Sequence, residues 1–303
     1  MTSSASSFRL DALHVFQVRT LGSLGFSTRV ALSNKSHNKG QYATDYRVDV
    51  TVHSASGQLL THQKGIAELA VGSIVRIDCA KWQAAQADQV MIFHLMPRRL
   101  LPVRRDDGTV EVARDEIWSL FTAQDHYVEY YRDDGFSTGV LYQSGAFNYE
   151  KFSREETTVI QAPKIYVSRT VDTLLSVLHT SFETDYTRIA CLRYALLDKD
   201  GAVAVRGVLE IQPFTCRTLS FRGVLQAAGI VPGEATPSFY TLVALCDNAA
   251  LLPLVMNHNA AHGNLAVEHS LPPLYYGQSV TGAMRAEMVH NLRNSNLFKT
   301  HHE

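Results

Sequence analysis

The densest group of residues that could do chemistry lies in residues 257–273. Three of the chain's 13 histidines fall there beside a glutamate. On a helix, His258 and His262 would share a face and could chelate a metal ion, with Glu268 or His269 as a third ligand. The segment is rich in asparagine and glycine, however, and these residues favour turns over helices. We therefore expect a loop between two strands and no metal site.

Acid–base chemistry is a second interpretation of the same segment. Glu268 and His269 follow an apolar run, and neighbouring side chains of a strand point to opposite faces. A carboxylate or imidazole that faces inward needs a hydrogen-bond partner. Glu129, near His126, sits in a similar apolar run in the first half of the chain. Each glutamate could anchor a loop through backbone N–H groups, line a pocket as a general acid or base, or face solvent.

Aromatic side chains are concentrated in residues 127–149, which hold seven of them. Such a group can stack on a flat or sugar-like ligand, or it can form the core of a β-sandwich. We favour the core. As candidates for ligand binding we keep Tyr127, Tyr131, Tyr142, His258, His262 and Tyr275.

Several familiar signatures are absent from the sequence. It contains no G-x-x-x-x-G-K-[ST], no G-x-G-x-x-G after a strand and no G-x-S-x-G. These absences argue against nucleotide hydrolysis, dinucleotide redox chemistry and α/β-hydrolase chemistry. None of the four cysteines forms a C-x-x-C pair, so neither a disulfide framework nor a zinc site is indicated. We expect no cofactor.

Charge and hydropathy limit the partners. The formal net charge is -1 and the pI about 6.9, without the basic surplus that is typical of nucleic-acid binding. The arginines at 98, 99, 104 and 105 are followed at once by two aspartates, which indicates a solvated loop. No apolar stretch is long enough to span a bilayer, and the serine-rich start is no secretory signal. We expect a cytoplasmic protein whose partner is a small molecule or a protein, not nucleic acid or a membrane; a homo-oligomer stays open.

The elements that must position these residues are short strands. Residues 46–52 and 74–79 alternate between apolar and polar with period two, and residues 54–57 and 198–201 are turn signals between such runs. Strands of this kind recur along the chain with few short helices. This pattern predicts an all-β fold of the sandwich type.

Short segments also recur in the same order in the two halves of the chain. Residues 90–103 and 241–254 align without a gap, and each contains an apolar strand, a polar kink and Leu-Leu-Pro. Further matches pair residues 44–46 with 184–186, and residues 127–130 with 266–269. Several matches in one order are stronger than any single identity, so we predict an internal duplication.

The predicted organisation is two tandem β-sandwich units, residues 10–150 and 160–285. The first carries an insertion at 104–124 that we expect to be a short helix or lid, and residues 286–303 form a C-terminal helix or tail. The order of strands in each unit resembles an immunoglobulin-like sandwich, without the Cys-Trp-Cys arrangement of true immunoglobulin domains. We expect a binding or assembly protein with its site at the junction of the units; the alternative is an enzyme that uses Glu268 with His269, or Glu129 with His126.

Overall fold

The alternating runs of the sequence form antiparallel strands. The structure, a computed structural model, describes residues 14–34, 45–84, 86–97, 103–104, 110–111, 124–144, 157–180, 186–231, 238–268 and 280–299. Strands dominate this part of the chain, and none of its sheets is closed. The predicted all-β sandwich fold is confirmed.

Unit one is a sandwich of two four-stranded sheets. One sheet has the order β1 (His14–Arg19), β6 (Val90–Pro97), β3 (Tyr46–His53), β4 (Leu59–Leu69). The other has the order β10 (Ser137–Ser144), β9 (Gln124–Tyr131), β2 (Ser27–Ser33), β5 (Ile74–Asp78). Alternation directs Val48, Val50 and Val52 of β3 into the core between the sheets.

Three short elements complete the description of unit one. A 3-10 turn, η2 (Gly22–Leu24), joins β1 to β2, and β7 (Val103–Arg104) pairs with β8 (Val110–Glu111). The helix or lid that we predict for residues 104–124 falls mostly outside the described residues. Its described part belongs to the strands β7, β8 and β9.

Unit two is one continuous sheet folded into two leaves. One leaf has the order β14 (Val203–Ile211), β13 (Ala190–Leu197), β16 (Ser238–Cys246), β11 (Thr158–Val167). The other has the order β15 (Thr215–Ser220), β12 (Val171–His179), β17 (Leu252–Asn259), β18 (Asn264–Glu268). The leaves are joined where Val167 pairs with Asp172, and their apolar side chains meet in a second core.

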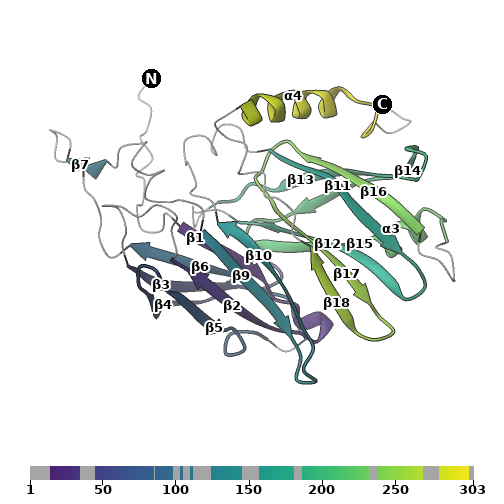
Figure 1. The fold of residues 1–303 in the computed structure, drawn as a ribbon. Helices are drawn as coiled ribbons and strands as arrows, with labels where there is room; N and C mark the ends of the chain where they lie inside the picture. Colours follow the sequence, from purple (N-terminus) through teal and green to yellow (C-terminus); the bar gives the residue numbers. More distant parts are fainter. Residues whose placement is uncertain are drawn as a thin grey trace.

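Two helices belong to the second half of the chain (Figure 1). Helix α3 (Phe221–Ala227) is capped by Ser220, whose hydroxyl accepts a bond from the backbone N–H of Gly223. Helix α4 (Val280–Asn294) lies over the leaf that contains β13, β16 and β11. No helix in the described residues combines the length and the apolar character needed to cross a membrane.

The two units have the same strand order. If β1–β6, β9 and β10 are matched in sequence with β11–β18, the order β1-β6-β3-β4 becomes β11-β16-β13-β14. The order β10-β9-β2-β5 likewise becomes β18-β17-β12-β15, and every pairing is antiparallel. Origin by duplication stays a prediction, but the two units share one topology.

The sequence matches agree with this correspondence in part. Residues 90–97 and 241–246 fall on the corresponding strands β6 and β16. Pro253 lies near the start of β17, before its pairing with β18 begins at Val255, where a proline costs no ladder bond on that side. The other Leu-Leu-Pro segment lies outside the described residues. The match of residues 127–130 with 266–269 does not agree with the strand order, because residues 127–130 lie on β9 and residues 266–268 on β18, and these two strands do not correspond.

Strand β12 is buried on both faces. Residues 173–179 of β12 are all buried. Leu175 and Val177 face the core of unit two, whereas Leu174 and Leu178 pack against unit one. A strand covered on both sides needs apolar or fully bonded side chains at every position, which explains the nearly continuous apolar run of β12.

The units interlock at a pair of turns. Gly57, in the β3–β4 turn, has a φ of 86°, and a Cβ at this position would lie 2.7 Å from the backbone oxygen of Pro213 in unit two. His53, beside this turn, stacks on Phe214 with ring centroids 4.9 Å apart. At another point of the interface, Arg132 Nη1 donates to the Gly263 backbone oxygen at 2.7 Å.

Replacing Gly57 with alanine should destabilise the protein through the interface. Both the left-handed φ and the contact with Pro213 oppose a Cβ, and we expect a loss of about 2 kcal/mol or more in chemical denaturation. Gly135 is the matched control, because it has the same φ of 86° in the β9–β10 turn and no atom within 4 Å of its Cβ position. Gly135→Ala should cost about 1 kcal/mol. Equal losses for the two variants would contradict the interlock.

Candidate functional site

A buried arginine joins the two units. Phe16 and Val18 of β1 point into the core of unit one, so alternation turns Arg19 towards unit two. The residue is only 6% exposed. Its guanidinium donates to Ser176 Oγ at 2.7 Å and to Thr218 Oγ1, both in unit two, and it forms an ion pair with Asp88 of unit one.

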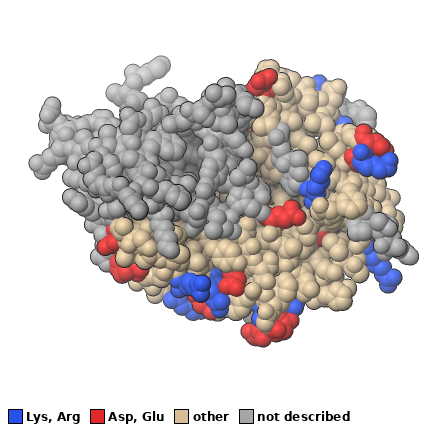
Figure 2. Space-filling model, viewed as in Figure 1, with Lys and Arg blue, Asp and Glu red and all other residues tan. Residues whose placement is uncertain are grey.

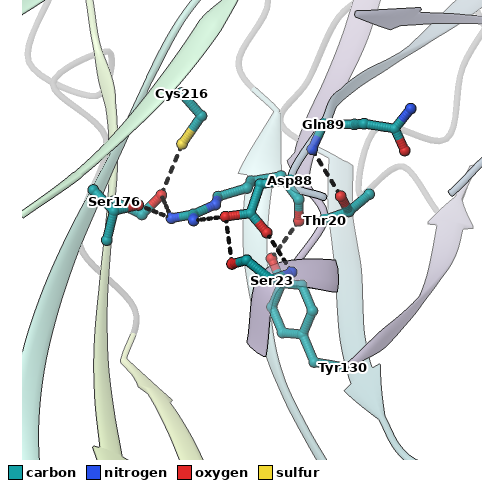
Figure 3. Close-up of polar contacts among 9 residues, drawn as sticks. Thr20, Ser23, Asp88, Gln89, Tyr130, Ser176 and Cys216 are labelled. Atoms are coloured by element: carbon teal, nitrogen blue, oxygen red, sulfur yellow. Dashed lines mark hydrogen bonds and ion pairs between the residues drawn. The ribbon is translucent and has the colours of Figure 1, made fainter. Parts of the chain in front are cut away.

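The partners of Arg19 are themselves held in place (Figure 3). Asp88 accepts bonds from the backbone N–H and the hydroxyl of Ser23, at 3.1 and 2.8 Å. Tyr130 Oη donates to the Arg19 backbone oxygen at 2.9 Å. The Cys216 thiol lies 2.8 Å from Ser176 Oγ. We call Arg19, Asp88, Ser176, Thr218 and Cys216 the junction cluster.

The protonation states of the junction cluster suit a structural contact and not a reactive centre. Burial alone would lower the pKa of Arg19, but the Asp88 carboxylate acts against it through charge and a hydrogen bond; the pKa is raised and the guanidinium stays charged. Burial raises the pKa of the Cys216 thiol, which therefore stays protonated and is a poor nucleophile. The charge of Arg19 is balanced by Asp88 within the cluster.

An open groove of about 440 Å³ lies at the same interface, beside the interlocked turns. One wall comes from the β3–β4 turn of unit one and the other from two segments of unit two. We call it the junction groove. Its lining residues are Ser56, Gly57, Gln58, Tyr186, Thr187, Gln212, Pro213 and Phe214.

Hydrogen bonds within the turns fix both walls of the junction groove. In unit one, Ser54 accepts the backbone N–H of Gly57 with its carbonyl and that of Gln58 with its hydroxyl, at 2.9 and 3.2 Å. In unit two, the Thr215 hydroxyl donates to the Gln212 oxygen at 2.6 Å. Phe214 adopts a φ of 58°, a conformation that a bulky residue keeps only where its surroundings enforce it.

Two histidines support the aromatic side chains of the groove. His53 stacks on Phe214 at an interplanar angle of 10°, and His179 meets Tyr186 edge to face at 5.4 Å. Nδ1 of His179 lies 3.1 Å from the Ile211 oxygen. Burial lowers the pKa of both imidazoles, so at neutral pH they are uncharged. None of the eight lining side chains carries a charge at neutral pH, so the groove offers hydrogen bonds and apolar contact.

The structure does not bring Glu129 and His126 together. Both lie on β9, but His126 is fully buried and accepts the Ser33 N–H at Nδ1, 3.1 Å away. Glu129 points to the opposite face, where its carboxylate pairs with Arg29 at 3.2 Å. An acid–base pair across a strand is ruled out by this geometry.

Glu268 bonds to a side chain, whereas the sequence analysis considered a bond to backbone N–H groups of a loop. It is half-buried and accepts a bond from Asn257 Nδ2 at 2.6 Å; the other end of that amide accepts the Thr173 hydroxyl, also at 2.6 Å. Glu268, Asn257 and Thr173 thus form a row of hydrogen-bonded side chains across β18, β17 and β12. His269 and Tyr275 lie outside the described residues.

The remaining candidate ligands are spread over the molecule. Tyr131 donates to Asp78 at 2.8 Å, and Tyr127 lies over Gly139, on the solvent-facing side of β9. The backbone of Tyr142 pairs with that of His126, and its side chain is not described.

His258 and His262 are not arranged as metal ligands. His262 is exposed in the β17–β18 turn. His258 lies opposite Asp172, and burial lowers its pKa against the raising effect of that carboxylate. Within the part of the chain that the structure describes, no group of three His, Cys, Asp or Glu side chains is placed to hold a metal ion.

Sequence reasoning missed the residues that the structure brings together. Arg19 ends an alternating run, and alternation from Phe16 and Val18 could have flagged it as facing away from the core of unit one. Its partners Ser176 and Thr218 lie 157 and 199 residues further along the chain, and no local pattern connects them. The groove residues likewise come from three connecting segments far apart in the chain, and no local pattern connects these either.

Comparison with known proteins gives only distant structural matches. No protein-family model matches the chain, and no curated protein matches its sequence. Among solved structures, a glycosyl hydrolase family 2 member from Bacteroides cellulosilyticus is 9% identical, with 88% of this chain and 29% of that chain covered and a TM-score of 0.20. A putative β-galactosidase from Bacteroides fragilis is 10% identical, with 86% and 33% covered and a TM-score of 0.18.

A third match is equally distant. A β-glucuronidase from Ruminococcus gnavus in complex with D-glucuronic acid is 10% identical, with 86% of this chain and 36% of that chain covered and a TM-score of 0.19. The chain thus spans about a third of the length of the structures it matches. TM-scores of this size carry no functional inference, so the chemistry has to come from the residues of this chain.

Breaking the ion pair of the junction cluster should cost far more than breaking an exposed one. Arg19→Met leaves Asp88 uncompensated in a largely buried site, and we expect a loss of roughly 3 kcal/mol in the free energy of unfolding. Arg29→Met removes the partner of Glu129 on an exposed face and should cost less than about 1 kcal/mol. Chemical denaturation measures both. Similar losses would show that Arg19 does not hold the joint.

A partly buried histidine on β6, His94, predicts acid sensitivity. Nε2 of His94 lies 3.0 Å from Thr51 Oγ1, and burial, aided by His62, lowers its pKa from 6.5 to about 4. Between these values the unfolded chain binds a proton that the folded protein does not, so stability falls as the pH drops below 6.5. The slope contributed by one such group is at most about 1.4 kcal/mol per pH unit.

The substitution His94→Gln should flatten the pH dependence of stability between pH 6.5 and about 4. Denaturation midpoints measured across this range test the expectation. An unaltered profile in His94→Gln would mean that this imidazole is not the group that takes up the proton.

Proposed function

We propose that the protein is a binding protein whose ligand occupies the junction groove. The observation that carries the proposal is the composition of this groove, which takes one wall from each unit at a fixed interface. A ligand seated there contacts both units at once. Ligand sites at domain interfaces are common, because two surfaces meeting at an angle leave a concave space.

The lining favours an uncharged ligand that carries hydroxyl or amide groups. Gln58, Thr187 and Gln212 supply neutral donors and acceptors, and Tyr186 with Phe214 supply aromatic surface. A charged ligand would need an opposite charge to offset its desolvation, and the lining has none. A polyhydroxylated compound of sugar type combines apolar faces with hydroxyl edges and fits this combination of side chains.

Acid–base catalysis is the less supported function. The pair that would have carried it in unit one is split across β9, and Glu268 is engaged with Asn257. Burial of the Cys216 thiol and pairing of Arg19 leave the junction cluster without a free nucleophile or base. Binding, with both units in fixed positions, is what these contacts support.

A thermal-shift experiment with simple sugars tests the proposal. Glucose, maltose and cellobiose are the neutral probes, and glucose 6-phosphate is the charged comparison. A ligand that binds only the folded state raises the melting temperature in a concentration-dependent way. We expect a rise with a neutral probe and none with the phosphorylated one.

Filling the groove should abolish the response. Thr187→Trp places a large ring in the groove at an exposed position, so the fold should tolerate it. Gln226→Trp, at an exposed position on α3, is the control and should keep the response. A shift that survives Thr187→Trp, or one produced only by the charged sugar, would refute a neutral ligand in this groove.

A further inference from the structure

Each of the two aromatic rings that line the junction groove contacts a histidine that is buried behind it. His53 of unit one stacks on Phe214, and His179 of unit two meets Tyr186 edge to face. The two histidines are only 7% and 1% exposed. Both aromatic walls of the groove are therefore supported by side chains that can gain a charge.

Hydrogen bonds fix which nitrogen of each imidazole carries the proton. Nδ1 of His53 lies 3.3 Å from the Gly57 oxygen. Nδ1 of His179 lies 3.1 Å from the Ile211 oxygen. A carbonyl oxygen only accepts, so Nδ1 is the protonated nitrogen in both neutral rings. A second proton must then go to Nε2, which in His179 lies 3.5 Å from the Tyr186 hydroxyl.

The electrostatic surroundings of both histidines favour the neutral form. Among the described residues, the charged group that acts on His179 is Arg188, whose guanidinium also lies 5.9 Å from the centre of the Tyr186 ring. The titratable side chain that interacts with His53 is another imidazole, His94. Burial lowers the pKa of both groove histidines below 6.5, and no described carboxylate acts on either ring to raise it.

The neighbouring strands also bring no carboxylate to these rings. His53 lies opposite Val90 of β6 and Leu59 of β4. His179 lies opposite Thr215 of β15. A second proton on either ring would therefore place an uncompensated charge inside the interface, and such a charge is relieved when water reaches it.

The groove end of the interface is the part that can yield to such a charge. The groove walls are formed by connecting segments, and Phe214 holds a strained φ of 58° in one of them. The junction cluster around Arg19 lies further along β12, at Ser176, three residues before His179. Parting of the groove walls gives both imidazoles access to water and relaxes Phe214, while the junction cluster keeps the units docked. The opening is thus local.

We propose that the junction groove is a pH-controlled site, with fixed walls at neutral pH and parted walls in acid, and that protonation of His53 and His179 drives the change. The regulation of a ligand rests on the proposed function, whereas the opening is a property of the free protein. In the parted state both imidazoles are hydrated and regain an ordinary pKa. Acid favours the state with the higher histidine pKa, so the walls part as the pH falls below 6.5.

The distance between the two walls, measured in the free protein, tests the proposal. Spin labels at Gln58→Cys and Thr187→Cys, both exposed positions of the lining, report this distance, and Cys191→Ser removes the exposed native thiol. We expect a constant distance above pH 6.5 and a longer one as the pH falls below this value. With His53→Gln and His179→Gln added, the distance should stay constant, because an amide keeps a donor and an acceptor but takes up no proton.

A control and a ligand measurement complete the test. His94→Gln removes a histidine outside the groove that also titrates in acid, and the walls should still part. The rise in melting temperature with maltose should disappear in acid for the native sequence and persist in His53→Gln, His179→Gln. A wall distance that ignores pH overturns the pH control, as does one that changes equally in the double variant or stops changing in His94→Gln. If the walls part as expected and no neutral sugar raises the melting temperature at any pH, the proposed ligand is wrong and the pH control stands.

Discussion

Arg19 brings a full charge into an interface that is apolar on either side of it, and the two units can meet only where that charge is paired. The flanking contacts, such as Ile92 against Leu178, are non-directional and would tolerate small shifts between the units. The guanidinium tolerates none, because its partners Ser176 and Thr218 belong to adjacent strands of unit two. We infer that hydrophobic burial supplies the adhesion and the junction cluster supplies the register.

The outer sheet faces of the two units have different surroundings: the other unit, solvent or helix α4. Their side chains differ accordingly. The face of β12 and β17 that meets unit one is apolar, with Leu174, Leu254 and Met256. The corresponding face of β2 and β9 in unit one is exposed and carries Arg29 and Glu129 as an ion pair. Repeated units need a polar or covered surface at each end of the array. A charged sheet face terminates one end here, and α4 terminates the other (Figure 1).

Charged residues on the surface lie in small mixed groups. In the view of Figure 2, the described surface carries Lys, Arg, Asp and Glu in small mixed groups separated by neutral residues. On the described part of this face, opposite charges lie next to each other and do not form two large opposing regions. Pairs such as Arg132 with Asp134 leave the neighbouring surface open for neutral contacts.

Local pattern predicted the strands well because alternation is a local property. Residues 46–52 alternate because one side of β3 faces a core, and the turn at 54–57 needs a glycine with positive φ at Gly57. The two halves of the chain share one order of strands, and the division into duplicated units stays a prediction. The match of Glu129 with Glu268 failed because short apolar strands resemble one another, and only pairing partners show that β9 corresponds to β17.

The site was beyond sequence reasoning for a related reason. The junction groove depends on how Gly57 meets Pro213, and that contact joins residues far apart in the chain. Pairing across such a distance leaves no periodic signal. The histidines that support the groove are His53 and His179, which had no motif around them, whereas His258 and His262, which the sequence singled out, do not line it.

The strained backbone at Phe214 ties the groove to the interface. A left-handed conformation at a bulky residue costs on the order of 1–3 kcal/mol, and it persists only where the surroundings supply more than that. Here the stack with His53 comes from unit one, and the turn that carries Phe214 is fixed by Thr215 in unit two. The shape of one groove wall therefore depends on the docking of the other unit. A ligand that binds Phe214 only in this conformation would stabilise the docked state, and docking would favour the binding of that ligand by the same free energy.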